Sequence, residues 1–349
     1  MKTVAVILVN YRDYARQYLA DCLASVRTQT GAPPIRLYIV DNATTEESET
    51  FLKNAAPEAE LILNRANDGF AKGNNDGLRR ALAEGADYCI LFNMDTVIEG
   101  HCVAHLVRKA EADPAIGAVQ ARLMLWGEKE RVNSLGNRTH FLGFGYCSGY
   151  RSRYKPDAPA AEDIGYPSGA AVLLTRELLQ TIGLFDETYW MYNEDQDLGW
   201  RAQLAGYRIV LAAEAVVWHK YAFQRLASKY YWMDRNRILS ILKNYRWGTL
   251  LLIAPAFWVM ELGVLFFAFR QGWVREKFKV WGYFLSPAHW VVLLRERRRV
   301  QRLRKRTDRE ITRDFSGSIW YAEIDSPALR WVNPLFAGYW RCVRALLWW

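Results

Sequence analysis

The chain has 349 residues, which favours two structural units over one small domain. With 51% hydrophobic and 24% charged residues, its composition excludes a disordered or fibrous protein. The net charge of +9 is unevenly spread, because residues 1–219 carry 22 basic and 28 acidic side chains and residues 220–349 carry 24 basic and 9 acidic ones. The basic part also holds 11 of the 15 tryptophans, a combination that favours an anionic membrane surface over a nucleic acid as partner.

The five cysteines have no paired spacing, so the sequence predicts neither a zinc site nor a disulfide framework. A reducing compartment is therefore expected. Residues 1–3 lead directly into an apolar run and show no signal peptide, so we expect the chain to fold in the cytoplasm.

The first part of the chain alternates apolar runs, at 4–9, 35–40, 59–63 and 87–92, with amphipathic stretches of helical length. This alternation predicts an α/β protein with a mostly parallel sheet flanked by helices. In such sheets ligands bind at the carboxyl ends of the strands, and all four of these ends are rich in Asn or Asp. Neither a dinucleotide fingerprint nor a Walker A loop occurs there.

The next part is predicted to cover and complete this sheet. Residues 130–165 are irregular, with glycines at 136, 143, 145 and 149 and a basic, tyrosine-rich stretch, which favours a loop or β-ribbon that acts as a lid. A helix is expected over 176–182, another opening near Glu194, and a strand ending at His219.

After residue 220 the pattern changes to long helical runs at 230–245, 249–269 and 280–294, followed by a cationic run at 295–306. Residues 249–269 are long enough to span a membrane and carry a single charge, Glu261. Both flanks are basic, however, which a single crossing tolerates poorly. We expect helices that lie in or dip into the cytoplasmic membrane face, and a true span, a hairpin or a dimer interface is the alternative.

Three groups of residues have the chemistry of a reactive site. Asp95 follows a strand and is placed to hold a hard cation against a diphosphate, although it also fits a cap of a helix near Glu99. Glu194 and Asp195, with Asp197 close behind, follow a run of aromatics and suit either a general base or N-terminal caps. His219 is either a core histidine or a metal ligand that completes the Asp95 site.

These segments, in this order, resemble the inverting family 2 glycosyltransferases of GT-A fold, in the branch of bacterial rhamnosyltransferases that build O-antigens and cell-wall polysaccharides. The resemblance covers roughly the first 220 residues. It divides the chain into a nucleotide-sugar-binding catalytic domain at 1–220 and a basic, Trp-rich helical membrane-associating region at 221–349. The matching segments are Val9–Tyr11, Val40–Asn42, Asn67–Asn75, Phe92–Thr96, Gly169–Ala171, Gly183–Glu187, Asn193–Leu198 and Val217–His219.

The resemblance implies a role for each matched residue. Asp41 is expected to accept a hydrogen bond from a uracil or thymine ring, and Gly169 lies where the chain passes close to the donor sugar or the acceptor. The other donor-binding residues are Asn10, Asn67, Gly69, Phe70, Gly73, Asn74 and Asn93.

The resemblance also implies a catalytic base and a metal site. Asp195 corresponds to the base, with Glu194 beside it. Asp95 and His219 correspond to ligands of a divalent cation, Mn²⁺ or Mg²⁺. Asn93 departs from the family pattern because it replaces the first aspartate of the D-x-D motif, which removes one negative charge near the metal.

The activity so implied is metal-dependent transfer of a sugar, with inversion, from a nucleoside diphosphate to a lipid-linked or polysaccharide acceptor in cell-surface glycan synthesis. The favoured donor is dTDP-rhamnose, and galactofuranose, glucose and N-acetylglucosamine donors are alternatives. The enzyme is expected on the cytoplasmic face of the inner membrane, as a peripheral or monotopic protein and a possible homodimer, without a nucleic acid partner. A non-catalytic, membrane-docked nucleotide-binding protein is the other reading. A nucleotidyltransferase is disfavoured because Asn10–Asp13 is not a glycine-rich, basic loop.

Overall fold

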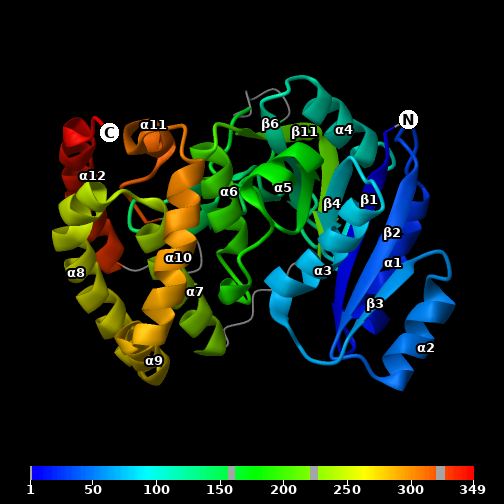
Figure 1. Ribbon diagram of the computed structural model, residues 1–349, viewed down its shortest axis with the longest axis horizontal. Coiled ribbons are helices and arrows are strands. Elements are labelled where there is room, and N and C mark those ends of the chain that lie inside the picture. Colours follow the sequence, from blue (N-terminus) through cyan, green and yellow to red (C-terminus); the bar gives the residue numbers. More distant parts are fainter. Residues whose placement is uncertain (1, 156–161, 221–226, 320–326) are drawn as a thin grey trace.

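The structure, a computed structural model, describes residues 2–155, 162–220, 227–319 and 327–349. Figure 1 shows a sheet flanked by helices in one half of the molecule and a bundle of helices, formed by the C-terminal part, in the other. Within the described residues nine strands form the large sheet. In spatial order they are β3 (Glu60–Asn64), β2 (Ile35–Asn42), β1 (Val4–Tyr11), β4 (Tyr88–Phe92), β10 (Ala171–Thr175), β6 (Ile116–Leu125), β11 (Arg208–His219) and β5 (Thr96–Ile98), with β7 (Val132–Ser134) paired to β6.

The direction of the strands brings the polar segments together. Strands β3, β2, β1 and β4 are parallel, so their carboxyl ends share one edge of the sheet. Strand β10 runs antiparallel to both β4 and β6, and its first residue, Ala171, pairs with Phe92 at the end of β4. At the end of β11, His219 pairs with Thr96 of β5. The ends of β1, β2, β4 and β11 and the start of β10 therefore lie along one edge.

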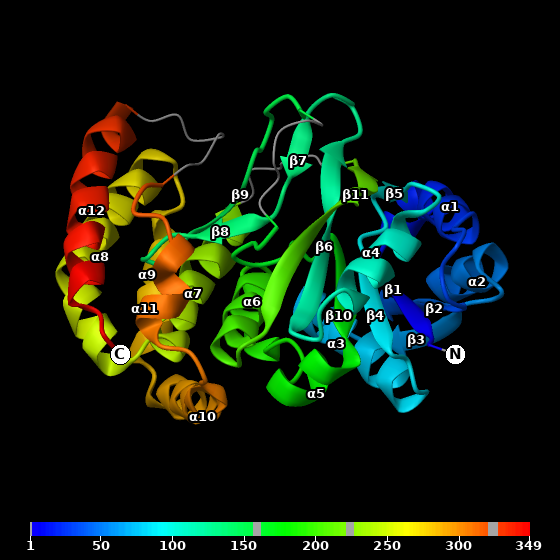
Figure 2. The ribbon, with the colours of Figure 1, turned by 90° about the horizontal axis from the view of Figure 1, so that it is seen from above.

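Helices cover both faces of the sheet, as Figure 2 shows. One buried apolar layer packs α1 (Tyr14–Arg27), α2 (Glu46–Ala55) and α4 (Cys102–Glu111) against the sheet. The other packs α3 (Gly69–Ala83), α5 (Arg176–Ile182) and α6 (Glu194–Leu204). The predicted sheet flanked by helices is confirmed, and the predicted helices at 176–182 and from Glu194 begin where expected.

The segment predicted as a β-ribbon forms short strands. Strand β7 extends the large sheet, and β8 (Asn137–Thr139) pairs with β9 (Gly145–Cys147) in a separate two-stranded ribbon. Residues 156–161, which belong to the predicted lid, lie outside the described residues. Movement of this segment as a lid stays a prediction.

The C-terminal part forms a helical unit that shares its core with α6. Its helices are α7 (Ala227–Asn244), α8 (Trp247–Arg270), α9 (Val274–Leu285), α10 (Pro287–Leu303), α11 (Asp308–Ile311) and α12 (Pro327–Leu346). Trp200 and Leu204 of α6 are buried in the same apolar cluster as side chains of α7, α8, α10 and α12. The expected boundary near residue 220 adjoins residues 221–226, which the structure does not describe, and it stays a prediction.

One expectation for this part is wrong in detail, and one helix was not expected. The run at 280–294 is not one helix, because α9 ends at Leu285 and α10 starts at Pro287. Proline lacks an N–H and disfavours a helical conformation in the residue before it, so Pro287 fits the first position of a helix and not its interior. The sequence patterns also missed α12, which contains Pro334.

A buried cluster of four charges fixes helix α8 to its neighbours. Lys277 Nζ lies 2.6 Å from Glu261 of α8 and 2.7 Å from Asp234 of α7. Arg237 of α7 pairs with the same two carboxylates. The two positive side chains neutralise the two carboxylates. Glu261, the charged residue inside the apolar helix, is therefore paired with cations from α7 and α9.

Candidate functional site

Asn10 and Asp41 lie side by side at the ends of β1 and β2 and are both almost fully buried. Asn10 Nδ2 donates to Asp41 Oδ1 over 2.7 Å, and Asn10 Oδ1 accepts from the backbone N–H of Ala15. The other carboxylate oxygen of Asp41 accepts from Ser48 Oγ over 2.6 Å. The Asp41 carboxylate is therefore held in one orientation at the sheet edge.

The predicted segment Asn67–Asn74 packs against the turn that follows Tyr189. The Ala71 N–H donates to the carbonyl of Trp190 over 3.1 Å, and the Trp190 indole N–H donates to the carbonyl of Asn67. Gly69 has a φ of +80°, and a Cβ there would collide with the Trp190 carbonyl, so no other residue fits this contact.

Other predicted residues stabilise the same segment from within. The Gly69 N–H donates to Asn67 Oδ1, and Asn74 Nδ2 donates to the carbonyl of Phe70. A Cβ on Gly73 would lie 2.9 Å from the Asn42 side chain, so α3 can approach β2 closely because residue 73 is glycine.

Gly169, just before β10, lies between Phe70 and Asp195. Its N–H donates to Asp195 Oδ2 over 3.2 Å. A Cβ at this position would come within 2.9 Å of the Phe70 ring. The structure thus brings together three residues that were selected from three separate segments of the sequence.

Asp195 and Glu194 occupy the first turn of α6, and their pKa values move in the same direction. Burial raises the pKa of Asp195 to about 6, although the N–H groups of Gly169 and Gln196 stabilise its charged form. Burial, followed by the charge of Asp195, raises the pKa of Glu194 well above its ordinary value. At neutral pH Asp195 is therefore ionised, while the protonated form of Glu194 is favoured.

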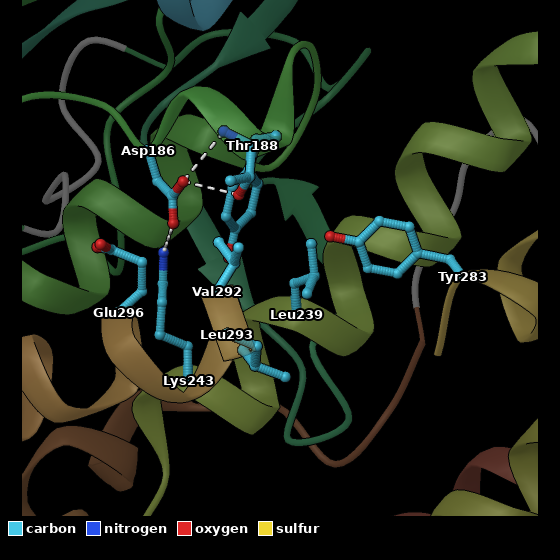
Figure 3. Close-up of a pocket in the computed structure, with 9 residues that line it drawn as sticks. Asp186, Thr188, Leu239, Lys243, Tyr283, Val292, Leu293 and Glu296 are labelled. Carbon is cyan, nitrogen blue, oxygen red and sulfur yellow. Dashed lines mark hydrogen bonds and ion pairs between the residues drawn. The ribbon is translucent and has the colours of Figure 1, made fainter. Parts of the chain in front are cut away.

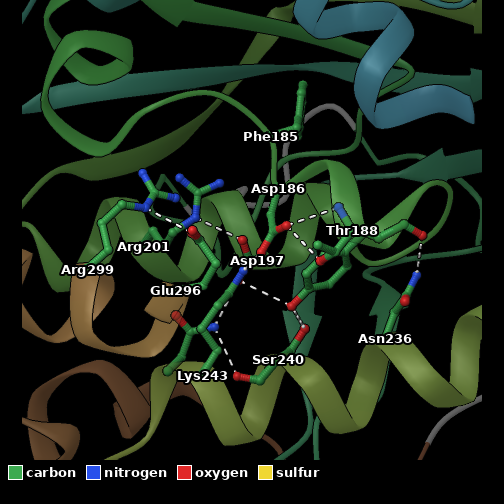
Figure 4. A network of polar contacts seen from close by, with 12 residues as sticks. Phe185, Asp186, Thr188, Asp197, Arg201, Asn236, Ser240, Lys243, Glu296 and Arg299 are labelled. Atoms are coloured by element: carbon green, nitrogen blue, oxygen red, sulfur yellow. Dashed lines mark hydrogen bonds and ion pairs between the residues drawn. The ribbon is translucent and has the colours of Figure 1, made fainter. Parts of the chain in front are cut away.

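The third carboxylate of this turn, Asp197, has a structural role. It is fully buried and lies 2.8 Å from both Arg201 and Lys243. Lys243 of α7 also pairs with Asp186 over 2.5 Å (Figure 4). The neighbouring cavity drawn in Figure 3 measures about 10 Å³, which is room for about one water molecule, so it is not a substrate site.

The turn from Trp190 to Asn193, which leads into α6, has an unusual backbone. Trp190, Tyr192 and Asn193 have φ values of 60°, 68° and 63°. Non-glycine residues rarely adopt this left-handed region, and each such residue costs on the order of 1–3 kcal/mol. Other contacts must therefore stabilise the turn that presents Asp195.

Helix α7 supplies these contacts through Asn236, which is fully buried. Its Nδ2 lies 2.9 Å from the carbonyl oxygen of Tyr189, 2.8 Å from that of Met191 and 2.7 Å from that of Tyr192. Figure 4 shows Asn236 reaching the turn from α7. One side-chain amide therefore holds three carbonyl groups of the turn.

Two neighbours on α7 fix Asn236 and the turn. Arg235 donates to Asn236 Oδ1 over 2.7 and 3.0 Å, so the amide nitrogen must face the turn, and Arg235 also donates to the carbonyl of Thr188. Trp232 stacks on Trp190 with ring centroids 4.8 Å apart.

The sequence analysis missed this function of α7. The available signal was the polar run Asp234–Arg237 within an aromatic and apolar helix. Successive residues point about 100° apart around a helix, so these four side chains cannot share one solvent-facing side.

Asp95 and His219 form a pair on the other side of the site. Asp95 Oδ1 lies 3.2 Å from His219 Nε2, and His219 Nδ1 lies 2.9 Å from Asn133 Oδ1. Burial raises the pKa of Asp95, but the hydrogen bond and charge of His219 more than offset this and leave it below its ordinary value. The alternative that Asp95 caps a helix near Glu99 is wrong, because β5 follows Asp95 and α4 begins at Cys102.

This pair fits part of a cation site. Among the described residues no group of three or more His, Cys, Asp or Glu side chains could hold a metal ion. A carboxylate oxygen and an imidazole nitrogen 3.2 Å apart can nevertheless bind one divalent ion when a diphosphate and water supply the other ligands. Asn133 orients the imidazole, as a partner of a metal-binding histidine does.

Asn93 lies beside this pair and connects it to the Gly169 segment. Its N–H donates to the carbonyl of Ala170 over 3.0 Å, and its own carbonyl accepts from Thr96 Oγ1 over 2.7 Å. The end of β4 is therefore fixed next to residue 169.

Comparison with known proteins agrees with this arrangement. The family model described as Glycosyl transferase family 2 matches residues 4–183. The N-acetylglucosaminyl-diphospho-decaprenol L-rhamnosyltransferase of Mycobacterium tuberculosis is 27% identical over 221 residues, which cover 58% of this chain and 71% of the relative. The O-antigen biosynthesis protein RfbC of Myxococcus xanthus is 24% identical over 241 residues, which cover 65% of this chain and 18% of that protein.

A similar fold occurs in the crystal structure of GalNAc-T7 with UDP, GalNAc and Mn²⁺. The TM-score is 0.56 at 14% identity, and the match covers 70% of this chain and 48% of that one. The architecture is the GT-A fold.

The contacts of Asn236 predict a local effect of its replacement. Asn236→Ala leaves the carbonyls of the turn without their donor, so we expect a loss of about 1–3 kcal/mol in the free energy of unfolding, measured in urea. Hydrogen exchange of the backbone amides at 190–196 should become faster.

Asn333→Ala is the matched control, because Asn333 pairs with the backbone N–H and carbonyl of Ile319, in the C-terminal unit. It should lower stability without changing exchange at 190–196. Unchanged exchange in Asn236→Ala would show that the turn does not depend on α7.

Proposed function

The chain belongs to glycosyl transferase family 2, and from this premise we propose that it transfers rhamnose, with inversion, from a nucleoside diphosphate to a lipid-linked acceptor. The observation that carries this proposal is the convergence of three groups at one sheet edge: Asp41, the Asp95–His219 pair, and Asp195 held by Gly169. Rhamnose and the lipid-linked acceptor are supported by the mycobacterial relative.

Asp41 and its neighbours are proposed to bind the nucleotide. Asn10 and Ser48 fix the Asp41 carboxylate, so it can accept the ring N–H of a uracil or thymine base without reorganising. Asn67, Gly69, Phe70, Gly73 and Asn74 then form the adjoining wall, and the rigid contact of Gly69 with Trp190 sets its distance from Asp195.

Asp195 is proposed as the general base. Its carboxylate takes the proton of an acceptor hydroxyl while the hydroxyl oxygen attacks the anomeric carbon from the side opposite the diphosphate. The new glycosidic bond forms as the bond from the sugar to the diphosphate breaks, so the configuration inverts in one displacement. A pKa of about 6 leaves Asp195 ionised at neutral pH yet basic enough to accept the proton.

Replacement of the base predicts a large loss of turnover. Asp195→Asn should keep donor binding, measured by thermal stabilisation with dTDP or UDP, and lower kcat roughly 100-fold or more. In the parent enzyme, activity should fall as pH drops through about 6, because the carboxylate becomes protonated there.

Glu194→Gln provides the comparison, since a protonated Glu194 resembles glutamine in shape and charge, and its effect on kcat should be much smaller. Near-normal turnover in Asp195→Asn would remove Asp195 from the mechanism.

A divalent cation is proposed to bind Asp95 and His219. When bound, it would offset the negative charge that builds on the departing diphosphate. Asn133 would keep the imidazole in the orientation that ligation needs, and Asn93 would stay close enough to bind a ribose hydroxyl or a metal-bound water.

Metal binding should depend on both ligands. Excess EDTA should abolish transfer, and Asp95→Ala and His219→Ala should each lose nucleotide-dependent Mn²⁺ binding, measured by calorimetry. His101→Ala removes an exposed histidine from α4's N-terminal end and should bind Mn²⁺ normally. Full activity in EDTA would contradict a metal role.

The helical unit is proposed to dock on the cytoplasmic face of an anionic membrane. Trp247–Arg270 is, among the described residues, the helix long and apolar enough to cross a membrane, with a mean hydropathy of 2.2 and 22% of its apolar window buried. Its exposed apolar side chains share one face, and α12 and the C-terminus add others. They are Leu251, Trp258, Leu262, Phe266 and Phe269, with Trp331, Leu335, Leu346 and Trp348.

This surface favours a helix that lies in the interface over one that spans the membrane. Glu261 faces away from the exposed side and pairs with Arg237 and Lys277. Insertion of α8 alone would break these pairs and leave buried charges without partners, which costs about 3–5 kcal/mol.

Membrane docking predicts that the full chain floats with anionic liposomes. The double variant Trp258→Glu, Phe266→Glu should not float, because it places charge on the proposed lipid-facing side. Leu63→Glu adds a charge at another partly exposed apolar position, on β3, and should float normally. A full-length protein that remains at the bottom of the gradient would contradict the docking.

A further inference from the structure

A second cavity lies at the carboxyl-end part of β6 and β11, and the proposed reaction does not use it. It measures about 250 Å³. Since a water molecule occupies about 30 Å³ of liquid, a phosphate or diphosphate group fits inside. Its lining comes from β6, β11, the segment before β7 and the segment after β9, and its charged residues are Arg122, Lys129, Glu130 and Arg153.

Arg122 stands out in this cavity because its guanidinium has no acceptor among the described residues. Its Nε is buried and makes no hydrogen bond. Its Cζ lies 4.0 Å from the centre of the Tyr154 ring, a cation–π contact that holds the guanidinium against the ring. By contrast, the buried Arg201 and Arg237 each meet a carboxylate. Burial of polar N–H groups without partners is costly, so the arrangement of Arg122 suits an anionic ligand.

The other charged residues that line the cavity are also mostly positive. Arg153 pairs with Glu130 over 3.1 Å, which leaves Arg122 and Lys129 without a carboxylate inside the cavity. A guanidinium with free N–H groups binds two oxygens of a phosphate at once, and a nearby lysine adds a mobile positive charge. The lining is therefore complementary to a phosphate or diphosphate.

The strand positions place this cavity next to Asp195. Gln120 and Arg122 are two residues apart on β6 and so point to the same face. Gln120 Oε1 accepts from the N–H of Ser168 over 2.8 Å, and the next residue, Gly169, donates to Asp195.

The cavity also lies on the opposite side of Asp195 from the nucleotide residues. In the sheet, β4 and β10 separate β1 and β2, which carry Asn10 and Asp41, from β6 and β11, which carry the cavity. On β11 the lining residues Val216 and Trp218 alternate with Val217 and His219, so they point to the opposite face of the strand from His219 of the proposed cation site. An anion bound by Arg122 is therefore on the acceptor side.

We propose that Arg122, with Lys129, binds the diphosphate of the lipid-linked acceptor and thereby positions the acceptor hydroxyl at Asp195. The proposal rests on the function proposed above and adds the residues that select an acceptor by its charge. Tyr154 holds the guanidinium against its ring, and Trp218 and Val216 form the apolar wall beside it.

Two measurements on the full-length protein test this subsite. In the first, inorganic pyrophosphate is titrated by calorimetry in the presence of EDTA, and Arg122→Ala should weaken its binding about tenfold or more. Arg122→Lys keeps the charge but loses the planar fork, so its binding should be intermediate. Arg108→Ala, which removes an exposed arginine from α4, should bind as the parent does.

In the second measurement, two acceptors are compared: N-acetylglucosaminyl diphosphate on a short prenyl chain, and the uncharged octyl N-acetylglucosaminide. Arg122→Ala should raise the KM of the diphosphate acceptor about tenfold or more and leave the KM of the donor and of the uncharged acceptor unchanged.

Several results would overturn the assignment. Equal effects on both acceptors would mean that Arg122 acts on structure, and a raised donor KM would mean that it binds the nucleotide diphosphate. Pyrophosphate binding that is lost in Asp95→Ala but kept in Arg122→Ala would place the anion at the donor site. Inorganic phosphate binding that needs Arg122 while both acceptor KM values stay unchanged would indicate a site for free phosphate.

Absence of transfer to both acceptors counts against the proposed function, whereas the pyrophosphate titration still decides on the subsite.

Discussion

The site depends on a strained turn that cannot hold its own shape. Three left-handed residues between Trp190 and Asn193 set the direction in which α6 begins, and with it the position of Asp195. The side chain that holds the carbonyls of Tyr189, Met191 and Tyr192 is Asn236, more than 40 residues later in the chain. The helical unit is therefore part of the site's architecture, although its composition differs from that of the sheet domain.

Buried charges keep α7 in the place that this contact requires. Lys243 lies between Asp186 and Asp197 at one end of α7, so loss of this lysine would leave the buried Asp186 without a cation, whereas Asp197 would keep Arg201. Near the middle of α7, Asp234 and Arg237 face the cluster that fixes α8, while Arg235 and Asn236 face the turn. Adjacent positions of one helix thus contact both the charge cluster that fixes α8 and the turn that leads to Asp195, which gives a short physical connection between α8 and this turn.

The sequence predicted the secondary structure and the site residues well wherever these depend on residues that are close together in the chain. The apolar runs predicted β1 to β4, and the rule that ligands bind at the carboxyl ends of strands selected Asp41 and Asp95. The sequence was a poor guide where a side chain meets a partner far along the chain. Nothing in the local pattern shows that Asp197 pairs with Lys243, or that Asn236 meets the carbonyl of Tyr192. The break at Pro287 was visible in the sequence, but the apolar periodicity on both sides of it suggested one continuous run.

The reversed direction of β10 explains how one sheet can carry both the proposed donor site and the proposed acceptor site. Parallel strands place their polar ends at the same edge, which suits a nucleotide that lies across β1 and β2. Because β10 enters the sheet antiparallel, its first residues, and not its last, reach that edge, and the chain before it passes between the two halves. Gly169 lies at this crossing. Phe70, in the proposed donor wall, packs close to it, and the Gly169 N–H donates to Asp195. The N–H of the preceding residue, Ser168, donates to Gln120. A side chain at residue 169 would push Phe70, in the proposed donor wall, away from Asp195, the proposed base, so their close approach requires glycine here.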